Sequence, residues 1–173
     1  TVLDVAAATS LSADTDAGDD GGISIDSIGN LTVGLIDAAA GAVTLDSTGD
    51  IDSAADDGTA DVTGGVVSLI AAAGGIGQTA PLDVTASTTL SADTDAGDDA
   101  AISIDSIGNL TVAVIDAAAG AVTLDSTGDI DGGTDDATAD VTGGLGSLVA
   151  AAGGIGQNTV LDVAAATSLS ADT

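Results

Sequence analysis

The stretch GISIDSIGNLTVGLIDAAAGAVTLDSTGDI, residues 22–51, contains the same short pattern twice. ISI at 23–25 is followed by GNL at 29–31, and VTL at 43–45 is followed by GDI at 49–51. In each copy a polar residue lies between two apolar ones, which predicts a short strand with one buried face. A Gly-Asn or Gly-Asp turn then precedes another inward apolar residue. A unit that turns a corner and recurs after about twenty residues predicts one coil of a β-solenoid.

The chain also repeats over a second, longer period. LDV at 3–5 returns at 82–84 and again at 161–163, and residues 159–173 are identical to residues 1–15. The first and third copies agree better with each other than with the second. This alternation indicates that the full unit of a longer array consists of two 79-residue halves.

These periods predict a single continuous all-β solenoid over residues 1–173. Apolar pairs within one repeat are spaced by 20, 20, 24 and 15 residues, so we expect about 20 residues per coil and four coils per repeat. The units are 1–79, 80–158 and the partial unit 159–173. Because the sequence has no initiator Met, signal peptide or lipidation motif, we expect it to be an excerpt from a longer array.

The composition favours a thin rod over a globular core. The chain contains no Lys, Arg, His, Cys, Met or aromatic residue, and all 28 acidic residues are Asp. A globular core is hard to fill without aromatic residues and Met, because these supply large buried areas, whereas a narrow solenoid needs only stacked aliphatic side chains. Acidic low-complexity chains are often disordered, but 45% of these residues are hydrophobic and many alternate with polar ones, which favours a folded chain.

The formal charge of −28, without a basic residue, argues against several classes of function. It disfavours binding to nucleic acid or anionic lipid and points to cations or basic partners. Without His, Cys or Lys, none of the common activated nucleophiles can be assembled, so we expect no enzyme. A polysaccharide lyase on a β-helix would need basic groups beside its Asp residues. The uncharged stretch 63–82 contains five Gly and one Pro, which predicts solenoid and no membrane span.

The acidic clusters predict candidate calcium ligands. They gather hard oxygen donors in Gly-containing loops, as Ca²⁺ prefers, and the sequence offers no soft ligand for another metal. The spacing fits neither an EF-hand nor a GGxGxDxUx repeat, so a solvated acidic loop is the competing interpretation. The candidate metal ligands are Asp14, Asp16, Asp19, Asp20, Asp93, Asp95, Asp98, Asp99, Asp50, Asp52, Asp129 and Asp131.

Stacked coils would also bring some carboxylates close together. Asp26 and Asp46 each follow an apolar pair, so on adjacent coils we expect them about 4.8 Å apart. Asp37 and Asp57 share a second common offset and predict a less regular ladder. Like charges at such distances repel, and cations or high salt would relieve the repulsion.

GNLTVGLIDAAAGAVTLDSTGDI at 29–51 and AAAGGIGQTAPLDV at 71–84 resemble the haemagglutinin-type repeats of large secreted bacterial surface proteins. These include the filamentous-haemagglutinin-like exoproteins of two-partner secretion. The most specific part is Gly-Gly-Ile-Gly, a short spacer and Pro-Leu-Asp-Val, although Val2 and Val160 replace Pro81 in the other copies. The resemblance covers nearly the whole chain. It implies a right-handed parallel β-helix that is secreted or lies on the cell surface.

The sequence therefore predicts a mechanical function. We expect a stiff, acidic spacer, the structural shaft of an extracellular filament or giant adhesin, that supports adhesion, biofilm or sheath formation. Its partners would be neighbouring repeats of the same chain, other copies of the rod, and cations, with no nucleic acid and no membrane. The alternative is a tandem array of Ig-like β-sandwiches, one for each of the longer repeats, rigidified by Ca²⁺. The spacing of the apolar pairs within each repeat and the missing aromatic core count against it.

Overall fold

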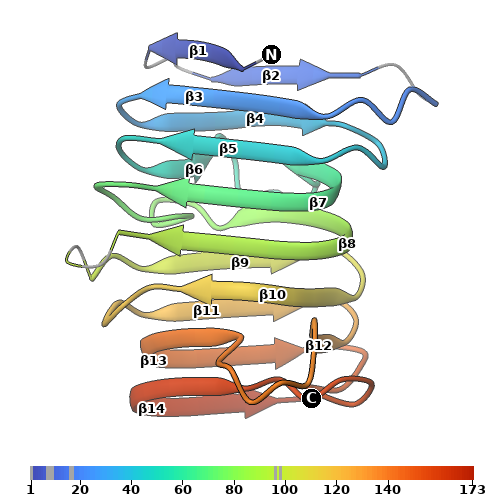
Figure 1. The fold of residues 1–173 in the computed structure, drawn as a ribbon, viewed down its shortest axis with the longest axis vertical. Helices are drawn as coiled ribbons and strands as arrows, with labels where there is room; N and C mark the ends of the chain where they lie inside the picture. The colour runs from blue at the N-terminus through green and yellow to red at the C-terminus, as the bar shows by residue number, and fades with distance from the viewer. Residues whose placement is uncertain (1, 7–9, 16–17, 96, 98) are drawn as a thin grey trace.

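The structure is a computed structural model that describes residues 2–6, 10–15, 18–95, 97 and 99–173. Within these ranges the chain forms a fourteen-stranded sheet and contains no helix, hence none long and apolar enough to cross a membrane. Each paired strand runs parallel to its neighbour, as in β3 with β5 and β4 with β6. The chain is a β-solenoid whose coils stack along one axis (Figure 1), so the predicted fold class is confirmed.

The strands alternate between two rows, one on each side of a narrow interior. Figure 1 shows β3 and β5 running to the left in front and β4 running to the right behind them, while the chain descends. This winding is right-handed, the hand that twisted parallel strands favour. The strands are β1 (Leu3–Ala6), β2 (Leu11–Asp14), β3 (Ile23–Ile28), β4 (Leu31–Asp37), β5 (Val43–Ser47), β6 (Ile51–Ser53), β7 (Val62–Ala71), β8 (Leu82–Thr94), β9 (Ile102–Ser106), β10 (Leu110–Asp116), β11 (Val122–Ser126), β12 (Ile130–Gly132), β13 (Val141–Ala150) and β14 (Val163–Asp172).

Apolar residues lie directly above one another in columns. Ile25 pairs with Leu45 and Leu45 with Leu69, each almost completely buried. The Ig-like alternative is therefore wrong, because Ile25 and Leu45 share one sheet and one interior. The whole column is Leu3, Ile25, Leu45, Leu69, Ala92, Ile115, Val141 and Val163.

Consecutive 79-residue repeats lie on opposite faces of the solenoid. Ile104 is the counterpart of Ile25 one repeat later, but it stacks between Leu82 and Leu124 in a second column. Figure 1 shows the result, with β3 and β5 in the front row and β9 and β11 in the rear row. Seven turns span about two repeats, so one repeat completes about three and a half turns.

The predicted coil length and the prediction of four coils per repeat are thereby corrected. The short step from the apolar pair at 67–69 to the one at 82–84 is only a passage from one face to the other. The residue that stacks on Leu69 is Ala92, which lies further along the chain than Leu82. Successive coils are roughly 22 residues apart, because corners and loops add length that the apolar spacing does not reveal.

Strand β7 passes from one row to the other through a bend at Gly64 and Gly65. Its first residues pair with the end of β4 and its later residues pair with β5, and the register against β8 shifts between Gly64 and Val66. A Cβ atom on Gly65 would collide with the carbonyl oxygen of Ala40, and one on Gly64 would lie 2.9 Å from Cγ2 of Val43. Two adjacent glycines are thus required where the backbone turns against the coil above.

Candidate functional site

Two acidic ladders follow the flat outer faces of the solenoid. Asp26 pairs with Asp46 in register, which confirms the predicted stacking, and Asp4 extends this ladder on the other side of Asp26. The equivalent ladder on the opposite face consists of Asp83, Asp105 and Asp125. Burial, together with the charges of Asp125, Asp83 and Asp56, raises the pKa of Asp105. These faces therefore hold rows of carboxylates at the spacing of the coils.

The other predicted ladder differs from the structure. Asp37 pairs with Thr63 on one side and with Asp14 on the other, so its predicted pairing with Asp57 is wrong. The reason is that residues 54–61 form a loop that leaves the stack between β6 and β7. One repeat later, Asp116 pairs with Asp93 in the same way.

Of the predicted calcium ligands, Asp14 near the end of β2 pairs with Asp37, and Asp93 near the end of β8 pairs with Asp116. Both side chains are exposed. Burial, and then the charges of Asp116 and Asp95, raise the pKa of Asp93. Four others are exposed in the loops that follow β2 and β8, while two lie outside the described residues. The exposed residues are Asp19, Asp20, Asp95 and Asp99, and the undescribed ones are Asp16 and Asp98.

The remaining predicted ligands at the corners accept hydrogen bonds from neighbouring coils. Oδ2 of Asp50 accepts a bond of 2.7 Å from Nδ2 of Asn30, and its Oδ1 accepts one of 2.9 Å from the backbone N–H of Gly75. One carboxylate thus connects the coil above it with the coil below. Oδ1 of Asp129 accepts the same bond from Gly154 in the next repeat.

Asp52 and Asp131, the middle residues of β6 and β12, also connect neighbouring coils. Oδ1 of Asp52 accepts a bond of 3.0 Å from the backbone N–H of Thr79. Asp131 receives bonds from both the backbone and the side chain of Asn158, at 3.0 and 2.7 Å. Although burial works in the opposite direction, these bonds lower the pKa of Asp131.

Acidic side chains at these corners are therefore part of the fold. Within the described part of the chain, no three acidic side chains converge where they could hold a metal ion. The calcium sites remain a prediction. The Gly-Asp turn is recognisable in the sequence, but the hydrogen bond that its carboxylate accepts from the next coil is not.

The least expected acidic group is a buried pair, formed by Asp61 at the end of the loop at 54–61 and Asp83 in β8. Asp61 and Asp83 are only 5% and 2% exposed, and Oδ2 of Asp61 accepts a bond of 3.0 Å from the backbone N–H of Asp83. Oδ2 of Asp83 is buried without a hydrogen-bond partner among the described residues. Burial, with smaller effects from the charges of Asp83 and Asp57, raises the pKa of Asp61 to about 6.

The same pair recurs in the second repeat. Oδ2 of Asp140 accepts a bond of 2.9 Å from the backbone N–H of Asp162, and Oδ2 of Asp162 is likewise buried with no described group bonded to it. Burial and the charge of Asp162 raise the pKa of Asp140. A hollow of about 180 Å³ adjoins the first pair and is lined by Gly34, Leu35, Ala54, Ala55, Asp57, Thr59, Ala60 and Asp61.

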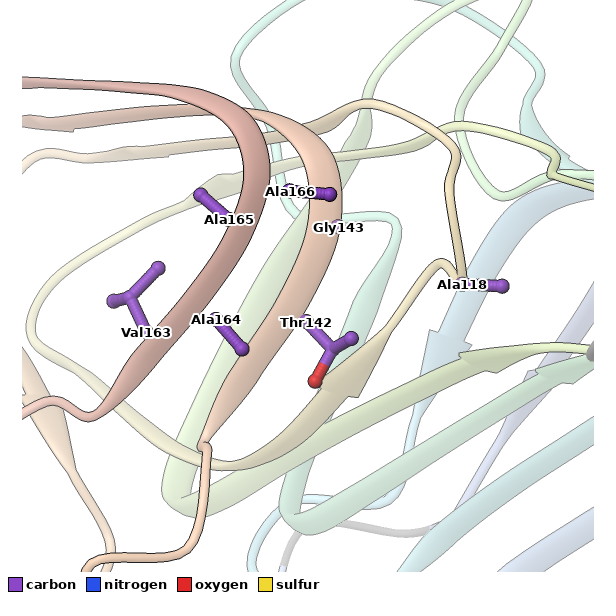
Figure 2. Close-up of a pocket in the computed structure, with 7 residues that line it drawn as sticks. All are labelled: Ala118, Thr142, Gly143, Val163, Ala164, Ala165 and Ala166. Carbon is purple, nitrogen blue, oxygen red and sulfur yellow. The ribbon is translucent and has the colours of Figure 1, made fainter.

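A larger hollow of about 410 Å³ lies beside β14. Figure 2 shows that its lining residues carry mainly methyl groups and the single hydroxyl of Thr142. The lining residues are Ala118, Thr142, Gly143, Val163, Ala164, Ala165 and Ala166. This hollow presents no acid, base or nucleophile stronger than a hydroxyl group.

Comparisons with protein-family models, curated proteins and solved structures found no match to this chain.

The buried Asp61 predicts that acidification stabilises the fold. Because its pKa is raised from 3.8 to about 6, the folded state binds more protons than the unfolded state between about pH 4 and pH 6. Stability gained at low pH is therefore lost as the pH rises through about 6. We expect Asp61→Asn to raise the free energy of unfolding at pH 7 by on the order of 2 kcal/mol. It should also weaken the pH dependence between pH 4 and 7.

Denaturant unfolding at a series of pH values measures this effect. Asp20→Asn is the matched control, because Asp20 is exposed and lies away from the pair, so this variant should keep the wild-type pH dependence. The interpretation fails if Asp61→Asn is less stable than the wild type at pH 7 while its pH dependence is unchanged.

Proposed function

We propose that this chain is a structural shaft, a stiff acidic spacer of an extracellular bacterial filament or giant surface adhesin. The observation that carries the proposal is the uninterrupted stack of coils, each hydrogen-bonded to the next in strands and at corners. Seven steps at about 4.8 Å give a rod on the order of 34 Å from this chain alone. Adding repeats would lengthen such a rod without changing its cross-section.

The chemistry of the surface supports a spacer over a catalyst or a nucleic-acid-binding protein. The charge of −28 repels nucleic acid and anionic membranes and keeps a long rod in solution. Without Lys or Arg, the chain has no cleavage site for trypsin-like proteases, which suits a protein exposed outside the cell. The resemblance to filamentous-haemagglutinin-like repeats supports the extracellular location. Adhesion, biofilm or sheath formation would depend on what the shaft carries.

Immunogold labelling of the bacteria that produce this sequence tests the proposed role. Antibodies raised against the folded chain should label intact cells on the outside or on material extending from them. Permeabilising the cells should add little further label. Label confined to the interior of permeabilised cells would contradict the proposal, and an antibody to a cytoplasmic protein provides the control.

We also propose that Ca²⁺ binds along the acidic faces of the shaft. The observation in favour is the register of Asp4, Asp26 and Asp46, which places like charges on three successive coils with no basic residue to balance them. A divalent cation between neighbouring carboxylates would reduce their repulsion. The exposed loop residues Asp19 and Asp20 offer further oxygen ligands.

Calorimetric titration of chelator-treated protein tests calcium binding. We expect dissociation constants on the order of 10⁻⁴–10⁻³ M, as in extracellular modules with few ligands, and a rise in Tm at saturation. The double variant Asp26→Asn/Asp46→Asn should bind fewer ions. Binding that is absent at about 10 mM Ca²⁺ would refute the calcium proposal, since this exceeds the expected constants at least tenfold.

A further inference from the structure

Four acidic residues stack on successive coils along one face of the solenoid. The backbone N–H of Asp61 donates to the carbonyl oxygen of Asp83 at 2.8 Å, so these two residues are neighbours on adjacent coils. Asp83 pairs in register with Asp105, and Asp105 pairs with Asp125. Neighbouring residues of this row are therefore one inter-strand spacing apart, about 4.8 Å along the axis. The chain contains no Lys, Arg or His to balance their charges.

The loop between β6 and β7 brings further carboxylates to the end of the row at Asp61. Asp57 on this loop and Asp61 line the same hollow of about 180 Å³. Burial raises the pKa of Asp83, a hydrogen bond from the backbone of Gly58 lowers it, and the charges of Asp56 and Asp57 raise it. The tip of the loop thus lies close enough to the row for its charges to act there. A loop with two negative charges is folded against residues of the same charge.

A buried carboxylate oxygen in this group points to a ligand. Asp83 is only 2% exposed, and its Oδ2 has no hydrogen-bond partner among the described residues. A buried carboxylate destabilises a fold unless it is hydrogen-bonded or paired with a cation. The feature recurs one repeat later, because Oδ2 of Asp162 is also buried without a described partner. The acidic residues of that second group are Asp135, Asp136, Asp140 and Asp162.

We propose that one Ca²⁺ ion binds between the tip of the loop and the buried pair, held by the carboxylates of Asp57, Asp61 and Asp83. This inference deepens the calcium binding proposed above and rests on it for the choice of ion. Carboxylate, carbonyl and water oxygens are the ligands that Ca²⁺ accepts, in a flexible geometry. Because no three of these acidic side chains converge in the described structure, the exposed loop must move Asp57 onto the ion as it binds. Asp56 is a further ligand within reach of this movement.

The position of the site gives it a role in the shaft. Asp61 belongs to the first repeat, residues 1–79, and Asp83 belongs to the second, residues 80–158. An ion held by both carboxylates connects consecutive repeats and fixes the loop against the coil below. Calcium would therefore stiffen the junction between repeats.

Titration of the intact, ¹⁵N-labelled and chelator-treated chain with Ca²⁺, followed by amide NMR spectra, tests the proposal. The backbone amide signals of Gly58 and Asp83 should shift and saturate, with a dissociation constant on the order of 10⁻⁴ M. The amide of Thr59, which donates to Oδ1 of Asp57 at 2.9 Å, should shift with them. Mg²⁺ should bind at least about tenfold more weakly, because it requires near-ideal octahedral geometry.

Substitution of the ligands locates the ion. Asp57→Asn and Asp83→Asn should each weaken Ca²⁺ binding at least about tenfold, because each removes a charged ligand. Asp57 is exposed, so this variant should fold even if the buried substitution prevents folding. Asp136→Asn is the matched control, since it removes the equivalent loop charge one repeat later and should leave the titration of Gly58 unchanged. The proposal is overturned if Gly58 and Asp83 do not shift at about 10 mM Ca²⁺, or if Asp57→Asn binds as tightly as the wild type.

The amide of Asp46 in the same spectra separates this site from calcium binding along the acidic faces. Shifts at Asp46 without shifts at Gly58 overturn the loop site and keep the binding along the faces. Shifts at Gly58 without shifts at Asp46 support the loop site alone. If neither amide shifts, both calcium proposals are overturned, while the shaft function is still decided by cell labelling.

Discussion

The stacking of each coil on the next is the constraint on which the rest of the structure depends. Backbone hydrogen bonds continue from the strands into the corners, as from Leu31 to Asp50 and from Ile51 to Gly75, at 2.8 and 2.9 Å. The interior is narrow enough that aliphatic side chains fill it without an aromatic residue. Equivalent side chains must therefore lie at the same position in every coil, and differences in the number of residues per coil are confined to loops and corners.

The same constraint explains where the acidic residues can be placed. On the flat faces they alternate with buried residues, as Asp26 and Asp46 do, and these two are partly exposed. Asp50 at a corner and Asp52 in β6 accept hydrogen bonds from adjacent coils. Asp61 and Asp83 depart from this arrangement, because both are buried where the end of the loop at 54–61 meets β8, and one carboxylate oxygen has no described partner. Charge repulsion thus acts along the axis, and backbone hydrogen bonding along the same axis opposes it.

The sequence predicts the solenoid because alternating apolar residues and Gly-Asp turns are local signals that recur. It predicts that Asp26 stacks on Asp46, since both lie at the same distance from an apolar pair in coils of equal length. The sequence does not predict the pairing partners of Asp37 and Leu82, because these partners depend on how many residues the loops and corners contain. The passage from Leu69 to Leu82 on the opposite face looks like a short coil in the sequence. The burial of Asp61 depends on the path of a loop that has no pattern of its own.

A disulfide between two outward-facing residues tests most directly that consecutive repeats lie on opposite faces of the solenoid and that successive coils are roughly 22 residues apart. Ser68 and Ser91 pair in register on adjacent coils, although they belong to different repeats. Because the chain has no Cys, the double variant Ser68→Cys/Ser91→Cys should form an intramolecular disulfide under mild oxidation. Ser24→Cys/Ser103→Cys, which places Cys at equivalent positions of the two repeats on opposite faces, should not. A disulfide in the second variant and none in the first would contradict this account of the fold.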